Sequence, residues 1–284
     1  MSKSLSASHP PAAEPFTSER AAPASDIRGQ LVFLGTGTSV GVPVIGCHCT
    51  TCTSTDSRNQ RLRCSIAMGL PEGTLLVDTT PDLRTQLLRE RIDLVNATLF
   101  THDHADHVFG LDDLRIFQHY LGHSMPVYCE EQVEARIRKS FDYAFTAESQ
   151  AYAGGVPQMV FNRIDLNPFV ALGQQIVPLR LTHGRFQVLG FRIGNVAYCT
   201  DTNRIPDESW PLLEGLDVLI LDALRPRPHA THFSLQEAIE VAQRLKPKRT
   251  LFTHMSHEIE HATVSGQLPD DMALAYDGLR VPLS

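Results

Sequence analysis

Three histidines and two aspartates lie within the six residues 102–107, which read His-Asp-His-Ala-Asp-His. Imidazole and carboxylate groups are ligands that zinc, manganese and iron accept. In an extended backbone, residues two apart face the same side, so His102 and His104 should point the same way. A turn into a helix would bring Asp106 and His107 to the opposite side of the same cleft. This segment therefore predicts ligands for two metal ions, with Asp106 counted among the catalytic residues as well.

Other candidate ligands directly follow apolar runs that end in threonine, as His102 follows ATLFT. His183 follows IVPLRLT, Asp201 follows VAYCT, and His254 follows RTLFT. If each run is a strand, these side chains lie along one rim of the sheets. Two metal ions held there would lower the pKa of a shared water and supply hydroxide near neutral pH.

A second cluster has C-x-C-x2-C spacing and consists of Cys47, Cys49 and Cys52. Three thiolates need a fourth ligand to complete a tetrahedral zinc site. His257 and His48 are the candidates, and His257 is favoured because the neighbours of His48 hinder it from turning inward. Unliganded thiols are the alternative, which the spacing disfavours. The remaining cysteines are expected to be buried, small apolar residues: Cys64, Cys129 and Cys199.

The bulk composition narrows the class of protein. The 284 residues are 42% hydrophobic, enough for a sizeable core, and the net charge is -7. A mildly acidic chain argues against broad nucleic-acid binding, which needs a basic face. We find no apolar run near the roughly 20 residues that a membrane helix needs, and no signal-peptide core, so we expect a cytoplasmic protein. Residues 1–28, rich in Ser, Ala and Pro, are predicted to be a disordered tail.

The elements that must position these ligands alternate between short apolar strands and helices. The sequence predicts strand followed by helix in TLLVDTTPDLRTQLLRERI and in PVYCEEQVEARIRKSF, and hairpin-like strands across QQIVPLRLTH and VLGFRIGN. Ser234 and Glu237 match a capping box, which predicts a helix that starts at Ser234. Mixed strands and helices predict an α/β (α+β) fold, a layered αββα arrangement, in one domain over residues 29–284.

The H-x-H-x-D-H motif, with His183, Asp201, His254 and Asp78 of LLVDTTPDL, resembles the metallo-β-lactamase superfamily over roughly residues 30–282. The resemblance implies an αββα sandwich and a hydrolase with two metal ions, zinc or manganese or iron. It implies one metal on His102, His104 and His183, the other on Asp106, His107 and His254, and Asp201 as the bridge. Asp78 would orient the ligands, or serve only as a turn residue ahead of Pro81.

The segment GTGTSVGVPVIGCHCTTC and the later THMSH resemble the phosphoribosyl cyclic phosphate phosphodiesterases. That resemblance implies a structural zinc on Cys47, Cys49, Cys52 and His257, and a small-molecule cyclic phosphodiester as substrate. It also implies that His232, just before the capped helix, contacts the phosphate and serves as general acid. His229 is the rival for that role.

Residues 141–160 depart from this pattern, being longer and more aromatic, and could form a lid or a homodimer contact. Several arginines are possible phosphate clamps, although arginines in loops are usually solvated: Arg115, Arg185, Arg204, Arg225 and Arg227.

Three other functions remain open. A ribonuclease Z shares the histidine motif, but it carries a Gly- and Lys-rich arm that this sequence lacks. The non-enzymatic pyrroloquinoline quinone biosynthesis protein B resembles the cysteine cluster, but its histidine motif is degraded. Thioesterases and lactonases share the metal core, which does not choose between phosphorus and carbon electrophiles.

Overall fold

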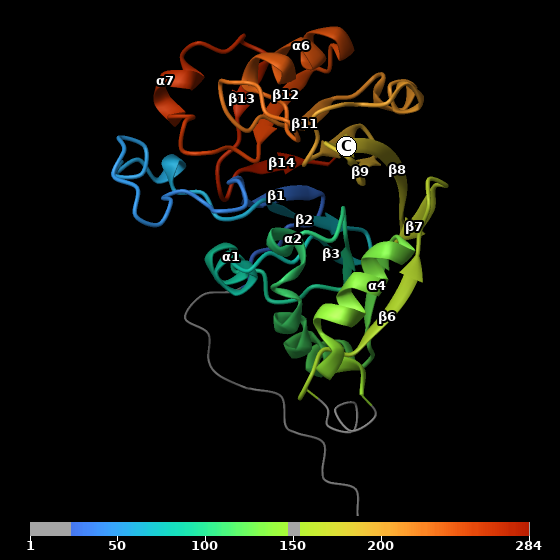
Figure 1. The fold of residues 1–284 in the computed structure, drawn as a ribbon. Coiled ribbons are helices and arrows are strands. Elements are labelled where there is room, and N and C mark those ends of the chain that lie inside the picture. The colour runs from blue at the N-terminus through green and yellow to red at the C-terminus, as the bar shows by residue number, and fades with distance from the viewer. Residues whose placement is uncertain (1–23, 147–153, 284) are drawn as a thin grey trace, which may run out of the picture.

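The computed structural model describes residues 24–146 and 154–283. Within these ranges, two seven-stranded sheets face each other (Figure 1). The first sheet contains β1 (Gln30–Gly35), β2 (Ser65–Leu70), β3 (Gly73–Val77), β4 (Ala97–Leu99), β5 (Met125–Cys129), β6 (Met159–Arg163) and β14 (Arg280–Pro282). Its strand order is β14-β1-β2-β3-β4-β5-β6.

The second sheet contains β7 (Phe169–Ala171), β8 (Gln174–His183), β9 (Phe186–Ile193), β10 (Val196–Cys199), β11 (Val218–Asp222), β12 (Arg249–Thr253) and β13 (Met272–Leu274). Its order is β13-β12-β11-β10-β9-β8-β7. Strands β10 to β13 pair in parallel, as do β3 to β6 in the first sheet. Parallel strands bring their carboxyl ends to one edge, where ligand sites commonly form in such sheets.

Helices cover the outer faces of both sheets, so the expected αββα sandwich is confirmed (Figure 1). On the first sheet are α1 (Leu83–Glu90), α2 (Ala105–Val108), α3 (Gln118–Leu121) and α4 (Glu131–Ser140). On the second are α6 (Leu235–Leu245) and α7 (His261–Ser265). Short 3-10 turns are η1 (Ser57–Asn59), η2 (Leu111–Phe117), η3 (Asp142–Phe145), η4 (Asp207–Ser209) and η5 (Pro211–Leu213).

Alternating side chains of β1 build two of the three apolar cores, as a strand's period of two requires. Leu31 and Phe33 are buried between the sheets, while Val32 and Leu34 are buried under the helices of the first sheet. The third core lies between the second sheet and α6. This helix starts after Ser234, and its capping box is formed, as predicted: Ser234 accepts from the Glu237 backbone N–H, and Glu237 accepts from the Ser234 N–H.

Two segments predicted to be irregular are only partly described. Residues 1–23 of the expected tail lie outside the described residues, but Ile27 is buried at 4% exposure and Arg28 pairs with Gly69. The folded chain therefore begins before the predicted boundary at residue 29. Of residues 141–160, the stretch 147–153 lies outside the described residues, whereas Phe141 and Val156 pack into the core of the first sheet.

Among the described residues, no helix is both long enough and apolar enough to cross a membrane.

Candidate active site

The histidine motif leaves the sheet just after β4 and enters the short helix α2. His104 is extended, with ψ 153°, and α2 begins at the next residue. This change of conformation places His102 and His104 beside His183, while Asp106 and His107 lie beside His254. The local geometry follows the sequence pattern: an extended pair, then a helical pair.

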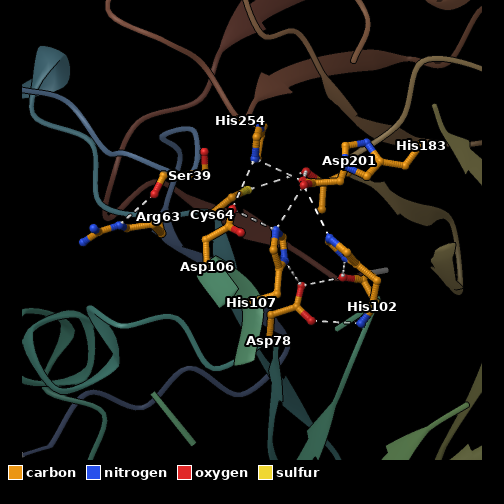
Figure 2. Close-up of polar contacts among 12 residues, drawn as sticks. Ser39, Arg63, Cys64, Asp78, His102, Asp106, His107, His183, Asp201 and His254 are labelled. Carbon is orange, nitrogen blue, oxygen red and sulfur yellow. Dashed lines mark hydrogen bonds and ion pairs between the residues drawn. The ribbon is translucent and has the colours of Figure 1, made fainter. Parts of the chain in front are cut away.

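Asp201 lies at the centre of these side chains, just past the end of β10 (Figure 2). Its Oδ2 is 3.2 Å from His107 Nε2 and 3.6 Å from His102 Nε2, and its Oδ1 is 3.2 Å from His254 Nε2. Asp106 Oδ2 lies 3.4 Å from His107 Nε2. The Asp201 carboxylate therefore contacts His102 on one side and both His107 and His254 on the other, which suits a bridge between two metals.

The candidate ligand atoms form two groups that share Asp201, and within each group the atoms lie within 4.8 Å of one another. One group consists of His102, His104, His183 and Asp201. The other consists of Asp106, His107, Asp201 and His254. The structure thus brings together all seven of the residues singled out from the sequence, in the two sets that the resemblance implied.

Three residues of this centre adopt the left-handed backbone conformation although none is glycine. The φ angles are 64° at Asp78, 55° at Asp201 and 58° at His254. This conformation is uncommon and costs free energy for residues with a side chain, so it persists where the surrounding fold enforces it. All three follow strand ends, where the turn aims the side chain back across the sheet edge.

The buried ring nitrogens fit a metal better than an empty cluster. His102 Nε2, His107 Nε2 and His254 Nε2 are buried and have no hydrogen-bond partner among the described residues. His107 Nδ1 donates to Asp78 Oδ2 over 2.8 Å, and His183 Nδ1 donates to the Thr231 carbonyl over 2.7 Å, whereas His254 Nδ1 has no hydrogen-bond partner among the described residues. Such bonds fix the tautomer that leaves the Nε2 lone pair for a metal.

The electrostatics of the cluster favour positive charge. Burial acts to lower the pKa of His254, but the carboxylates of Asp201 and Asp106 outweigh it and raise the pKa to about 9. Burial likewise acts to raise the pKa of Asp201, but the His254 and His107 rings hold that pKa well below its usual value. A pair of divalent cations would supply the positive charge that neutralises these carboxylates.

Asp78 forms hydrogen bonds with the candidate ligand His107 and with Thr101, so it does more than shape a turn. It is fully buried; its Oδ1 accepts from the Thr101 N–H, and its Oδ2 accepts from the Thr101 hydroxyl, each over 2.8 Å. The Thr101 hydroxyl in turn lies 2.9 Å from His102 Nδ1. One carboxylate therefore orients both His107, by direct contact, and His102, through Thr101.

We expect Asp78→Asn to weaken metal binding by about 10- to 100-fold, the usual effect of losing a partner behind a ligand. The amide preserves the shape but can present an N–H to the His107 Nδ1–H, which would break the bond that fixes the ring. Competition with a chromogenic chelator measures the affinity. Asp56→Asn, at the distant η1 cap, is the control and should leave affinity unchanged; equal affinity in both variants would contradict this role.

The sequence interpretation missed Asp222, which ends β11. Its Oδ2 accepts from His232 Nδ1 over 2.8 Å, and its Oδ1 lies 3.6 Å from His254 Nδ1. The signal was available, since Asp222 follows an apolar strand as Asp201 does, but the run VLILD lacks the threonine that marked the other ligands.

His232 lies inside the cluster and His229 at its margin. The His232 ring is 8% exposed, stacks on His254 with centroids 4.6 Å apart, and meets His183 at 4.6 Å. His229 is half-buried, contacts His232 at 5.4 Å, and its Nδ1 lies near the Thr231 hydroxyl.

The arginines proposed as phosphate clamps have mixed locations. Arg115 pairs with Asp112, and Arg227 pairs with Glu258, both on the surface. Arg225 donates to the backbone carbonyls of its own loop. Arg204 is exposed, with its backbone paired to Thr182, and Arg185 lies over the Phe186 ring. Of the five, Arg185 lies over Phe186, whose ring contacts the candidate ligand His104.

The cysteine cluster converges on His257. Cys47 Sγ and Cys49 Sγ each lie 3.3 Å from His257 Nδ1, and Cys52 Sγ belongs to the same group. Tetrahedral zinc with its usual bond lengths separates S and N ligands by about 3.5 Å, so the arrangement fits. The Cys52 backbone N–H, followed by His257, lowers the pKa of Cys49 to about 6, which favours the thiolate. His48 is exposed and outside the group.

The other three cysteines are buried, as expected: Cys64, Cys129 and Cys199. Cys64 lies beside the candidate metal ligands (Figure 2). Its Sγ is within hydrogen-bond reach of the Thr253 hydroxyl at 3.2 Å. A cavity of about 710 Å³ lies elsewhere, between α1 and η2, and no candidate metal ligand lines it.

Comparison with known proteins identifies the family. Residues 74–255 match the family described as "Beta-lactamase superfamily domain". An octanoyltransferase of Porphyromonas gingivalis (strain ATCC BAA-308 / W83) is 35% identical over 255 residues, which cover 87% of this chain and 50% of that protein. The chain thus spans about half the length of this relative.

Two solved structures are similar over nearly the whole chain. A diphosphatase from the PhnP family has a TM-score of 0.84 and 40% identity, covering 90% of this chain and 98% of that one. Zn²⁺-bound PqqB from Methylobacterium extorquens has a TM-score of 0.71, with 89% and 100% covered, but its 19% identity shows the fold alone. Fold, ligand geometry and family match agree, and the chain belongs to the metallo-β-lactamase superfamily.

Proposed function

We propose that this chain is a cytoplasmic phosphodiesterase with two catalytic metal ions and one structural zinc. Its substrate is a small molecule, either a ribose cyclic phosphate or a diphosphate diester. The observation that carries the proposal is the pair of ligand groups sharing Asp201, with the His232–Asp222 pair directly beside them. Zinc, manganese or iron suits the mixed N/O ligands, and zinc suits the thiolates.

The metal ions, when bound, supply a hydroxide nucleophile near neutral pH and neutralise charge on the phosphoryl oxygens. His102, His104 and His183 would hold one ion, while Asp106, His107 and His254 would hold the other. Asp201 would bridge the two. Asp78 fixes the rings of His107 and His102, so the lone pairs stay aimed at the ions.

His232 is placed to protonate the leaving oxygen. Its Nδ1 is held by Asp222, so Nε2 is the nitrogen that can give a proton. The His232 ring contacts His183 of the first ligand group and His254 of the second. His229 has no carboxylate partner at its Nδ1 and lies farther out, so we assign the general acid to His232.

Removing the general acid should matter only when the leaving group needs a proton. We expect His232→Ala to lower kcat on the order of 10²-fold with an alkoxide leaving group, and much less with p-nitrophenolate. His229→Ala is the matched control and should be near normal with both substrates. An equal loss with both leaving groups would indicate a merely structural role for His232.

The resemblance to the PhnP-family diphosphatase supports phosphorus chemistry, because that protein is 40% identical over 98% of its length. The likeness to an octanoyltransferase covers half of that protein, so an acyl thioester remains worth assaying. Nucleic acid is not the expected substrate, because a net charge of -7 disfavours binding of a polyanion. The residues 141–160 could contribute a homodimer contact, a proposal that sedimentation would address.

A substrate panel on metal-loaded protein tests the function. It contains bis-p-nitrophenyl phosphate, a ribose 1,2-cyclic phosphate, ADP-ribose, a precursor tRNA and an octanoyl thioester. We expect turnover of the small phosphorus substrates and none of the tRNA or thioester. Rapid turnover of the thioester without any of the diesters would overturn the proposal.

A further inference from the structure

The hairpin tip that joins β8 to β9 stands at the edge of the metal cluster. It consists of Gly184 and Arg185, between the candidate ligand His183 and Phe186. Phe186 is 45% exposed, and Arg185 is exposed as well. A single exposed aromatic residue needs no explanation by itself. Phe186 is distinguished by its contacts with His104 and Arg185.

Phe186 meets the cluster through His104. The two ring centroids are 5.5 Å apart and the rings are nearly perpendicular, at 86°. His104 in turn lies 5.1 Å from the His183 ring. The exposed phenyl ring is therefore one ring away from the site of the first metal ion, at the side where His104 is only half-buried.

The hairpin tip is held in place by the loop that carries His232. The Gly184 N–H donates to Asn203 Oδ1 over 2.9 Å, and Asn203 Nδ2 donates to the Ala230 carbonyl over 2.9 Å. Gly184 has φ +62°, and a Cβ there would lie 2.7 Å from Thr231 Cγ2. These contacts connect the tip to the 229–232 loop. The backbone at Phe186 is therefore already ordered, which reduces the entropy lost on ligand binding.

Arg185 adds an uncompensated positive charge. Its Cζ lies 5.0 Å from the Phe186 centroid, and no described carboxylate forms an ion pair with it. Two other arginines lie over aromatic rings among the described residues. Arg138 lies over Phe145 and Phe161. Arg244 lies over Trp210 at 3.7 Å, where the indole donates to the Ile205 carbonyl and packs into the core of the second sheet. The Phe186 ring contacts His104 instead, so this pair lies at the edge of the candidate active site.

We propose that Phe186 and Arg185 form a platform for a planar base, so that the substrate is a nucleotide-type phosphodiester or diphosphate. The ring stacks the base, and the guanidinium attracts the anion toward the cluster. A flat aromatic face with a neighbouring arginine is how proteins hold single bases without reading their sequence. This inference rests on the proposed phosphodiesterase function and selects among its substrates.

Binding of two reaction-product analogues tests the platform without relying on turnover. AMP and ribose 5-phosphate share the sugar and phosphate and differ in the base. Calorimetry on the metal-loaded protein should find AMP bound about 5- to 100-fold more tightly, the range for stacking one base. Phe186→Ala should reduce that ratio to near 1, while Phe186→Trp should preserve it. Arg185→Ala should weaken both ligands alike.

Val170→Ala removes another exposed apolar side chain, on β7, and Arg244→Ala removes another arginine that lies over an aromatic ring; both should leave the ratio unchanged. A thermal melt checks that each variant is folded. Equal affinities for AMP and ribose 5-phosphate would overturn the platform even if diesters are hydrolysed. A preserved ratio in Phe186→Ala would do the same. Failure to hydrolyse any diester would instead overturn the proposed function.

Discussion

Asp201→Asn should lower kcat on the order of 10³-fold and reduce the content of active-site metal. Asp201 is 2% exposed and contacts ligands of both groups, at 3.6 Å from His102 and at 3.2 Å from His107 and His254. Asparagine keeps the shape but removes the negative charge that bridges the two ions. The loss of a two-metal hydroxide source accounts for the size of the effect.

Metal analysis by mass spectrometry and steady-state kinetics on the same preparations would measure both consequences. Asp207→Asn, an exposed carboxylate in η4, is the matched control and should behave as the unchanged protein does. Exhaustive chelation should abolish the activity, and added zinc or manganese should restore it. Full activity of Asp201→Asn, or of the chelated protein, would show that the cluster is not the catalytic centre.

The second large effect is on stability, through the cysteine cluster. Cys49→Ser should lose one zinc and destabilise the fold by about 3–5 kcal/mol, as expected for loss of a structural metal. For a domain of this size, the melting temperature should fall by roughly 10 °C. The reason is that the zinc would join the loop of residues 47–52 to His257.

Catalysis should suffer less than stability in this variant. Arg61 is buried and donates to the carbonyls of Ser256 and Ile259, so the loop after His254 has a second anchor. We expect kcat/KM within about threefold of normal at 25 °C, a change of under 1 kcal/mol. His48→Ala is the control, since this neighbouring side chain is exposed, and it should retain the full zinc content. An unchanged metal count in Cys49→Ser would refute the zinc site.

Much of the metal centre could be predicted because its signals are local. The spacing within residues 102–107 and the position of His183, Asp201 and His254 after apolar runs are visible in short windows. Strand ends at one sheet edge are close in space, so the side chains that follow them meet. The same reasoning would have found Asp222, had the strand end itself been the criterion and not the threonine before it.

The sequence could not predict which of the five candidate arginines lies near the metal cluster. Arg115 and Arg185 both sit in exposed stretches of the sequence, but one pairs with a nearby aspartate and the other lies over Phe186 at the cluster. Both neighbours are local, since Asp112 lies three positions before Arg115 and Phe186 directly follows Arg185, but only the folded chain brings Phe186 to the cluster. The role proposed here for Phe186 likewise depends on its contact with His104, 82 positions earlier in the chain.

The sequence by itself determined the layered αββα class and the set of metal-binding side chains. Both depend on residue type and on periodicity along the chain. The tertiary structure decided which donors face which: His257 and not His48 against the thiolates, His232 and not His229 beside Asp222, and Asp201 between two groups of histidines. These choices arise where segments far apart in the chain converge, and left-handed turns such as those at Asp201 and His254 set the final direction of each side chain.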